Sequence, residues 1–355
     1  MISFRLDIMQ HYISQGNEII LLTPLDEKAI NRLPKVIKFI AIDFERTSKN
    51  PLNDLKLFKQ IRDILQKEKP HYVFTYTIKP NIYGTLAAKS CGIHSTMMMA
   101  GLGYTFTNNH ISSLIARNLY RFALSFSDFL FLLNKENVNR IMHYKMCNND
   151  KIIFLSGGEG VNLRKYEFSD NASETVSFIF IGRLIKEKGI HDFCKAANIV
   201  KLNHSNVSFF IAGELDTLYP GSLTEEELKQ YTNSGNVEFL GRVNISEFMK
   251  RKGLVVTIPS YYSEGLNRSL MEGCACGKPI LTTNHPGCKE TVKNGFNGYI
   301  VEKQNPQDLA NKMIQYINLS QDEKNRMSHN SRKLAEQFFD IHNVIDHYDR
   351  IIKSV

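Results

Sequence analysis

The sequence predicts an α/β protein with two doubly wound domains, each a parallel sheet covered by helices. Its 355 residues are many for a single core and suit two domains of common size. Apolar runs of strand length alternate with segments of helical periodicity along most of the chain, which is typical of parallel sheets. Polar and glycine-rich turns follow several of these runs, at the edge where doubly wound sheets bind ligands.

The composition indicates an ordinary globular protein. Hydrophobic residues make up 43% and charged residues 23%, with a mean hydropathy of -0.26. No apolar run reaches 18 residues and no signal-peptide pattern precedes the first strand, so we expect a cytoplasmic protein. The six cysteines show no metal-ligand spacing with histidines, and we expect them to be reduced and mostly buried.

The charge is unevenly placed. Residues 1–170 hold 22 Lys and Arg against 15 Asp and Glu, a net +7, whereas the remainder holds 22 against 21. Such asymmetry suits a domain that rests on an anionic membrane or handles a phosphorylated acceptor, although charge alone fits nucleic acid or a merely basic surface equally well. The chain carries no recognised nucleic-acid motif, so no nucleic-acid partner is expected.

Residues 1–156 form the first predicted domain. An amphipathic helix ending at Gly16 comes first, with Phe4, Leu6, Ile8 and Tyr12 at helical spacing. The elements that follow alternate in type: strand Glu18–Leu22, a short helix near Glu27–Arg32, strand Lys38–Ile42, helix Leu52–Lys67, strand Tyr72–Tyr76, a helix from Asn81, strand Ser95–Met99, helix Ile111–Phe126, strand Phe129–Leu133, helix Glu136–His143 and strand Lys151–Leu155.

Two loops of this domain are predicted to line a crevice. T-Y-T-I-K-P-N closes one strand and opens a helix, and A-G-L-G-Y-T-F-T follows the next strand. Both loops should lie at the carboxyl edge of the sheet. The predicted acceptor-side residues are Lys79, Asn81, Gly101, Gly103 and Tyr104.

Helix 111–126 allows two interpretations. Leu114, Ile115, Leu119 and Phe122 share one predicted face, with arginines elsewhere. That face could touch a membrane surface, or it could be an ordinary core face, which is the commoner case.

Residues 157–172 are predicted to link the domains. They contain S-G-G-E-G-V-N-L-R-K-Y, whose glycines could indicate a dinucleotide loop. That interpretation is weak, because such a loop needs a strand before it, a helix opening inside it and an acidic residue about 20 residues later. An interdomain crossing fits the polar residues and the tyrosine better.

Residues 173–334 form the second predicted domain, followed by a terminal helical segment at 335–355. Its predicted elements include strand Ser177–Ile181, helix Ile190–Leu202, strand Val207–Ala212, helix Thr224–Thr232, strand Val237–Leu240, strand Leu254–Ile258 and helices Pro306–Ile317, Asp322–Phe338 and Ile341–Ile352. Gly182 ends the first strand, so Arg183 and Lys188 are placed to bind a diphosphate, the guanidinium through two bonds and the ammonium as a point charge.

The stretch Ser260–Ile280, S-Y-Y-S-E-G-L-N-R-S-L-M-E-G-C-A-C-G-K-P-I, predicts a strand-to-helix turn. The helix is expected to begin near Leu266, and its N-terminus would offer backbone N–H groups to a phosphate. Glu272 follows Glu264 by eight residues, about two helical turns, so both carboxylates could face one crevice. A bare pair at this spacing would more often be two solvent-facing helix charges.

The surrounding residues resemble the family 4 glycosyltransferases, which are retaining enzymes of the GT-B fold. The resemblance rests on Glu264 and Glu272 within E-G-L-N-R-S-L-M-E-G, on G-R-L-I-K-E-K-G, on G-R-V and on H-P-G-C-K-E. It implies two Rossmann-like domains and a last helix that crosses back to the first domain. The loops at 75–81 and 100–107 look like a subgroup that extends undecaprenyl-diphosphate-linked sugars.

The resemblance also implies roles for named residues. Arg183, Lys188 and Glu264 would be catalytic, with Glu264 on the donor sugar and Glu272 on the ribose. The implied donor site comprises Gly182, Arg183, Lys188, Gly241, Arg242, Val243, Ser260, Glu264, Gly265, Leu266, Asn267 and Glu272. A UDP-sugar is the implied donor and an undecaprenyl-diphosphate-linked sugar the acceptor, at the inner face of a bacterial plasma membrane. No Asp-x-Asp occurs, so no metal or other cofactor is expected.

Three departures from the family pattern stand out. The first strand and its glycine loop are expected to be absent, which would open the first sheet and impair activity. Asn162 stands where an aspartate is usual, and no histidine occupies the loop at 100–104. The missing strand makes a catalytically crippled, membrane-docked scaffold one alternative to a transferase. A sugar-nucleotide epimerase of related fold is a second alternative, although the contexts of Glu264 and Arg183 favour transfer.

Overall fold

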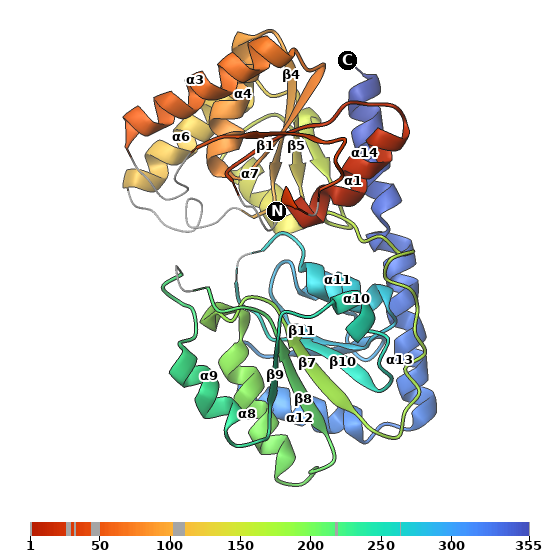
Figure 1. Ribbon diagram of the computed structural model, residues 1–355. Helices are drawn as coiled ribbons and strands as arrows, with labels where there is room; N and C mark the ends of the chain where they lie inside the picture. The colour runs from red at the N-terminus through yellow and green to blue at the C-terminus, as the bar shows by residue number, and fades with distance from the viewer. Residues whose placement is uncertain are drawn as a thin grey trace. The chain divides into compact units, whose positions relative to one another are not determined.

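The computed structural model describes residues 2–25, 30–31, 33–43, 50–101, 111–216, 219–262 and 264–354. The chain divides into two compact units (Figure 1). Unit 1 comprises residues 1–159 and 341–355, and unit 2 comprises residues 160–340. The sequence analysis predicted a first domain ending at residue 156 and a second domain spanning residues 173–334. Residues 160–172 differ most from that expectation, since they belong to unit 2 and bury Val161, Tyr166 and Asn171.

In the described part of unit 1 the strands form two parallel sheets. The larger has the order β3-β4-β5-β6, and the smaller pairs β1 with β2. Their bounds are β1 Ile20–Thr23, β2 Lys38–Ala41, β3 Tyr72–Tyr76, β4 His94–Met99, β5 Phe129–Leu132 and β6 Ile152–Phe154. No ladder joins β1 to β3 among the residues described. Leu22 of β1 and Val73 of β3 nevertheless pack into one apolar cluster with Leu57, Ile61 and Leu65 of the helix between β2 and β3, so the two sheets share a core.

Within the described ranges of unit 1, helices cover both faces of the larger sheet. They are α1 Ile2–Ser14, α3 Pro51–Glu68, η1 Pro80–Gly84 with α4 Thr85–Ser90, α6 Ile111–Ser125, α7 Lys135–His143 and α14 Ile341–Lys353. Side chains of β5 alternate, as the two-residue period of a strand requires. Phe131 packs with Ile8 of α1 and Tyr348 of α14, whereas Leu130 and Leu132 pack on the opposite face, the α6 side. Burying each such side chain contributes about 1.5–3 kcal/mol.

Helix α3 shows how the sequence sets a helix boundary. Asn50 caps it by accepting a hydrogen bond from Leu52 N, and Pro51 occupies the first helical position. Leu57, Ile61 and Leu65 recur every four residues and are buried. The short helix expected near Glu27–Arg32 falls mostly outside the described residues.

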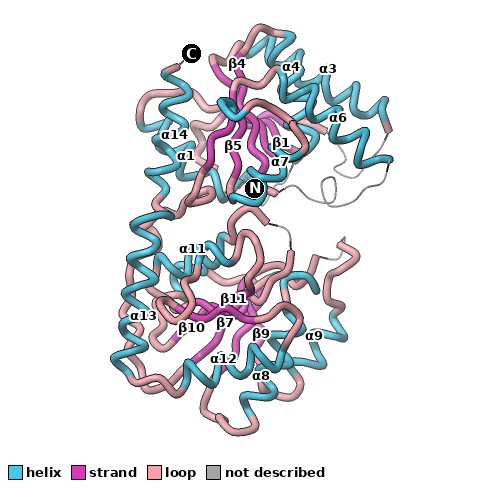
Figure 2. The backbone as a smooth tube through the Cα atoms, turned by 180° about the vertical axis from the view of Figure 1, so that it is seen from behind, coloured by secondary structure: helices cyan, strands magenta, loops and turns pink. Residues whose placement is uncertain are grey.

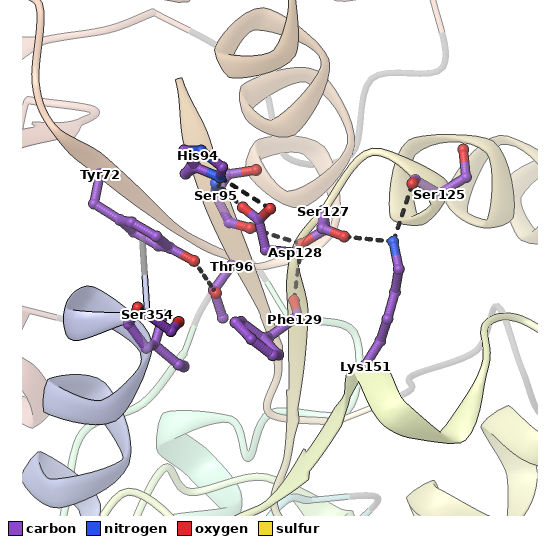
Figure 3. Close-up of polar contacts among 11 residues, drawn as sticks. Tyr72, His94, Ser95, Thr96, Ser125, Ser127, Asp128, Phe129, Lys151 and Ser354 are labelled. Carbon is purple, nitrogen blue, oxygen red and sulfur yellow. Dashed lines mark hydrogen bonds and ion pairs between the residues drawn. The ribbon is translucent and has the colours of Figure 1, made fainter. Parts of the chain in front are cut away.

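A polar clamp fastens the amino edge of the larger sheet (Figure 3). Asp128 accepts hydrogen bonds from His94 Nδ1 (3.0 Å) and Ser95 N (2.7 Å), joining β4 to β5. Lys151 Nζ donates to the carbonyls of Ser125 (3.0 Å) and Ser127 (2.7 Å), joining β6 to the turn before β5. These groups line an open pocket of about 430 Å³, and their bonds to one another indicate a structural role.

Helix α6 corrects one expectation. Leu114, Ile115 and Phe122 are 52%, 63% and 56% exposed. The apolar face that would more commonly pack into the core therefore lies on the surface. The core face is instead formed by Tyr120, Ala123 and Leu124, which are buried. No helix in the described ranges is both long and apolar enough to cross a bilayer.

The described part of unit 2 contains one parallel sheet of order β12-β11-β10-β7-β8-β9 (Figure 2). The strands are β7 Ser177–Ile181, β8 Ser208–Ala212, β9 Glu238–Gly241, β10 Leu254–Ile258, β11 Ile280–Thr283 and β12 Gly298–Val301. From β7 the order runs outward through β8 and β9 on one side and through β10 to β12 on the other. The carboxyl ends of β7 and β10 therefore flank a topological switch point, where open α/β sheets bind their ligands.

The helices of unit 2 complete its core. They are α8 Ile190–Lys201, α9 Glu225–Thr232, α10 Ile245–Phe248, α11 Arg268–Ala275, α12 Pro306–Ile317 and α13 Gln321–Leu334, with short turns η3 Lys186–Lys188, η4 Lys289–Thr291 and η5 Ala335–Phe339. Helix α8 packs beside α12, and α11 packs beside α13. The chain returns to unit 1 at Ile341, and Val344, Ile345, Tyr348 and Ile351 of α14 are buried there. The expected crossing of the last helix is thus confirmed.

A buried lysine ties the segment that enters unit 2 to the sheet. Lys278, just before β11, is fully buried, and its Nζ donates to Ser169 O (3.2 Å), Asn171 Oδ1 (3.1 Å) and Arg251 O (3.0 Å). Burial lowers the pKa of this ammonium to about 8. The G-K-P residues near the end of the Ser260–Ile280 stretch therefore have a structural role.

Candidate active site

The loops after β7 and β10 are in direct contact at the switch point of unit 2. Tyr261 N donates to Glu187 O (2.8 Å), and Ser260 Oγ donates to the same carbonyl (3.3 Å). Gly189 has a φ of +80°, and a Cβ there would lie 2.3 Å from Pro259 O. Only glycine fits both the backbone conformation and the space.

An ion pair joins these two loops. Lys188 Nζ lies 2.6 Å from Glu264 Oε2, and the two side chains are 12% and 14% exposed. The other carboxylate oxygen, Glu264 Oε1, accepts from Ser260 Oγ (3.2 Å) and Asn267 Nδ2 (3.1 Å). The structure therefore brings together four residues that the sequence analysis placed in the donor site.

The helix after this turn begins later than expected. Asn267 caps α11 by accepting from Leu270 N (3.2 Å), so the helix starts at Arg268 rather than near Leu266. Leu266 is 9% exposed and packs into the core of unit 2. Gly287 of the H-P-G segment holds the turn, since Asn267 N donates to its carbonyl (2.7 Å) and a Cβ on Gly287 would lie 2.6 Å from Gly265 O.

Glu272 lies in a different setting from Glu264. It is buried, and its Oε1 accepts from Tyr166 Oη (2.8 Å) and Arg268 Nε (2.9 Å). Arg268 Nη1 also donates to Gly160 O (2.6 Å). The two glutamates are not separated by two helical turns, as the sequence analysis expected, because Glu264 precedes α11 and only Glu272 is part of it. Burial and the adjacent Glu272 raise the pKa of Tyr166 well above its ordinary value.

Arg183 lies on the loop after β7 between two aromatic rings. Its guanidinium carbon is 5.5 Å from the ring centroid of Tyr219 and 5.4 Å from that of Tyr262. Its Nη1 lies 3.1 Å from Asp216 Oδ2, and 44% of the side chain is exposed. Lys188 Nζ lies 5.7 Å from the same Tyr262 ring, so one tyrosine adjoins both predicted phosphate-binding cations.

Gly182 and the loop after β9 complete the predicted donor site. Gly182 directly follows β7, and its carbonyl would lie 1.9 Å from a Cβ at Gly213, so the loops after β7 and β8 approach at backbone distance. Gly241 ends β9 with a φ of +62°. Arg242 Nη1 lies 3.5 Å from Glu214 Oε1, with both side chains more than half exposed, and Val243 packs partly into the core. These loops follow β7, β8 and β9, which are neighbouring strands of one sheet.

The acceptor-side residues of unit 1 are only partly where the sequence placed them. Asn81 is fully buried, and its amide donates to Met98 O (2.9 Å) and Tyr120 Oη (2.7 Å), so it joins η1 to β4 and α6 and does not line a crevice. Lys79 Nζ lies 2.8 Å from Asp54 Oδ1, with 12% of its side chain exposed. Gly101 is exposed, whereas Gly103 and Tyr104 lie outside the described residues.

Two family models match successive parts of the chain. A glycosyl transferase 4-like model matches residues 4–134, and a model described as glycosyl transferases group 1 matches residues 164–334. The chain belongs to family 4 of the glycosyltransferases. The segments that carry Arg183, Lys188, Glu264 and Glu272 all lie inside the second matched range, which is consistent with the resemblance seen in their motifs.

Known relatives of this glycosyltransferase include two bacterial enzymes. An N,N'-diacetylbacillosaminyl-diphospho-undecaprenol alpha-1,3-N-acetylgalactosaminyltransferase from Campylobacter jejuni is 27% identical over 99% of this chain and 96% of its own length. A UDP-Gal:alpha-D-GlcNAc-diphosphoundecaprenol alpha-1,3-galactosyltransferase from Escherichia coli is 25% identical over 84% and 79%. The crystal structure of Anabaena Alr3699/HepE in complex with UDP covers 100% of this chain and 96% of that one, with a TM-score of 0.80 and 18% identity. This likeness shows the GT-B fold.

The structure adds residues to the site that the sequence analysis of this glycosyltransferase missed. Tyr262 could have been found, because it lies two residues before Glu264 inside the Ser260–Ile280 stretch. Asp216, Tyr219 and Tyr166 carry no signal in the sequence, since their partners are tens of residues away. The described ranges hold no group of three or more His, Cys, Asp or Glu side chains arranged to bind a metal ion.

Proposed function

We propose that this glycosyltransferase moves a hexose or an N-acetylhexosamine from a UDP-sugar to a glycan carried on a lipid diphosphate, with retention of configuration. The observation that carries the proposal is the Lys188–Glu264 pair at the switch point of unit 2, with Arg183 on the same loop as Lys188. Cations for a diphosphate and a carboxylate for sugar hydroxyls lie side by side there. The acceptor class rests on the names of the two bacterial relatives, and the donor class on these names and on the UDP in the Anabaena structure.

The proposed roles follow from the chemistry of each group. Arg183 and Lys188 stabilise the charge that builds up on the departing diphosphate, which replaces a metal in this task. Glu264 is held by three side chains and is oriented to bind hydroxyls of the donor sugar. Both described bonds to Glu272 end on Oε1, so Oε2 is the oxygen that would bind a ribose hydroxyl.

The proposed reaction is a front-side displacement. The bond between the anomeric carbon and the β-phosphate oxygen breaks through an oxocarbenium-like state, and the acceptor hydroxyl forms the new bond on the same face. A phosphate oxygen of the leaving UDP takes the hydroxyl proton. The products are therefore UDP that carries the proton from the acceptor hydroxyl, and an extended glycan with the anomeric configuration of the donor.

We also propose that unit 1 docks on an anionic membrane surface through α6. Leu114, Ile115 and Phe122 form an exposed apolar stripe. Exposed Met142 at the end of α7 and exposed Lys145 in the following turn lie nearby, since Arg121 Nη2 donates to Tyr144 O (2.6 Å). Apolar side chains beside cations are the composition that favours the interface of an anionic bilayer. Docking there would bring the enzyme to a lipid-linked acceptor.

A transfer assay tests the proposed function. The full chain is incubated with a panel of UDP-sugars, with and without a short undecaprenyl-diphosphate-linked glycan, and product anomers are assigned by NMR. The proposal expects one donor to give an extended glycan of retained configuration and UDP release that depends on the acceptor. UDP release without any acceptor would favour an epimerase, and the absence of turnover with UDP binding intact would favour a scaffold.

A further inference from the structure

Arg183, the predicted diphosphate arginine, already has an anionic partner within its own unit. Asp216 Oδ2 lies 3.1 Å from Arg183 Nη1, and about a third of the Asp216 side chain is exposed. A diphosphate that binds the guanidinium through its two terminal nitrogens, Nη1 and Nη2, needs the edge whose Nη1 this carboxylate contacts. Lys188 differs, because its partner Glu264 is itself a predicted contact of the donor sugar.

The loop that carries Asp216 is built against the loop that carries Arg183. Leu184 N donates to Glu214 O (3.1 Å), Lys186 N to Gly221 O (2.8 Å) and Leu223 N to Leu184 O (2.7 Å). These backbone bonds hold the segments after β7 and β8 together on both sides of the ion pair.

Asp216 is also fixed within its own loop. Its N–H donates to Ser222 Oγ (2.9 Å), and its carbonyl accepts from Tyr219 N (2.8 Å). The ring of Tyr219 lies beside the Arg183 guanidinium, and Tyr219 Oη donates to Glu187 Oε1 (3.2 Å). The backbone of Asp216 is thus held through both its N–H and its carbonyl, which keeps its side chain within reach of Arg183.

We propose that Asp216 is an internal competitor of the donor diphosphate for Arg183. With the site empty, Asp216 neutralises the guanidinium and holds it between Tyr219 and Tyr262. When the diphosphate binds, Arg183 exchanges the carboxylate for phosphate oxygens, and after transfer Asp216 reclaims the arginine and favours release of UDP. Asp216 is therefore a positioning residue that sets nucleotide affinity, an inference that rests on the proposed donor site.

The competition should be modest, because partly exposed ion pairs hold their partners weakly. Replacing Asp216 by Asn should tighten UDP binding by about two- to fivefold and slow UDP release by a similar factor. Uridine, which has no phosphate, should bind the variant and the parent equally. The effect should need Arg183, so Asp216→Asn should change UDP affinity little in an Arg183→Gln background.

Calorimetry and stopped-flow release on the full chain test the inference, with UDP, uridine and inorganic pyrophosphate as probes. Glu225→Gln is the matched control, because it removes one exposed carboxylate from the nearby start of α9. Unchanged UDP affinity in Asp216→Asn would overturn the inference, and so would an equal gain in the Arg183→Gln background, which would indicate direct repulsion. Pyrophosphate binding with the expected gain but without UDP binding would refute the donor and keep the inference. If neither probe binds the parent chain, both proposals fail.

Discussion

Lys188 Nζ and Glu264 Oε2 lie 2.6 Å apart and join the loop after β7 to the loop after β10. Both side chains are largely removed from solvent. Removing one partner of such a pair leaves a charge without compensation, and this costs more than the net value of the pair. The pair is therefore part of the structure of the donor site as well as part of its proposed chemistry.

The first prediction concerns this pair. Lys188→Met and Glu264→Gln should each lower the free energy of unfolding by about 3 kcal/mol, because each removes one charge of the pair and leaves the other without that partner. The double variant should lose less than the sum of the two, since it removes both charges. Urea denaturation of the four proteins measures the cycle, and strictly additive losses would show that the two charges do not interact.

A second prediction uses two glycines of unit 2 with similar backbone angles. Gly189 and Gly235 have φ values of +80° and +70°, but only Gly189 lacks room for a Cβ. Gly235→Ala should cost about 1 kcal/mol from the left-handed conformation alone. Gly189→Ala should cost clearly more and should weaken UDP binding, because the loops after β7 and β10 must separate. Equal losses of stability in the two variants would mean that the close approach to Pro259 is unimportant.

A third prediction follows from Lys278. Burial lowers its pKa from 10.5 to about 8, so between pH 8 and 10.5 the unfolded state binds more protons than the folded state. The free energy of unfolding should therefore rise with pH across this window, by at most about 3 kcal/mol from this group. Denaturation at several pH values should show a rise in the parent that is smaller in Lys278→Met. Parallel pH profiles for the two proteins would refute this contribution.

A fourth prediction concerns α6. Phe122→Ser should reduce binding to anionic vesicles about tenfold, since it removes a large apolar side chain from the proposed interface. Phe296→Ser is the matched control, because Phe296 is an exposed phenylalanine of unit 2 (37%). Flotation at low and high salt separates the apolar from the electrostatic part. Equal losses in the two variants would place the membrane contact elsewhere or nowhere.

Much of the fold could be predicted from the sequence because its signals are local. The β-branched run Leu254–Ile258 forms strand β10, and α12 begins at Pro306 and ends at Ile317, as the sequence analysis predicted. The exposed apolar face of α6 was harder to predict, because this helix has two adjacent apolar faces. Periodicity alone does not say which of Phe122 or Leu124 meets the sheet; tertiary packing decides it.

The candidate site was predictable only where a motif is continuous. Arg183, Lys188 and Glu264 were found through their motifs, and the structure brings Lys188 and Glu264 into contact. Asn81 was misplaced, because a polar residue at the start of a helix can equally hold neighbouring elements together from inside the core. The Tyr166–Glu272 bond joins residues 106 positions apart, and one sequence carries no record of such a contact.

The proposed diphosphate site at the switch point of unit 2 is tested by calorimetric measurement of UDP binding to Arg183→Ala, with Lys186→Ala as the control on the same loop. Lys186 is a half-exposed neighbouring lysine whose Nζ faces Glu227 at 3.9 Å. The account predicts that Arg183→Ala weakens UDP binding by about 1.5–3 kcal/mol, the value of a hydrogen bond to a charged group, whereas Lys186→Ala leaves it nearly unchanged. Parental UDP affinity in Arg183→Ala, or equal losses in the two variants, would contradict a diphosphate site at the switch point of unit 2.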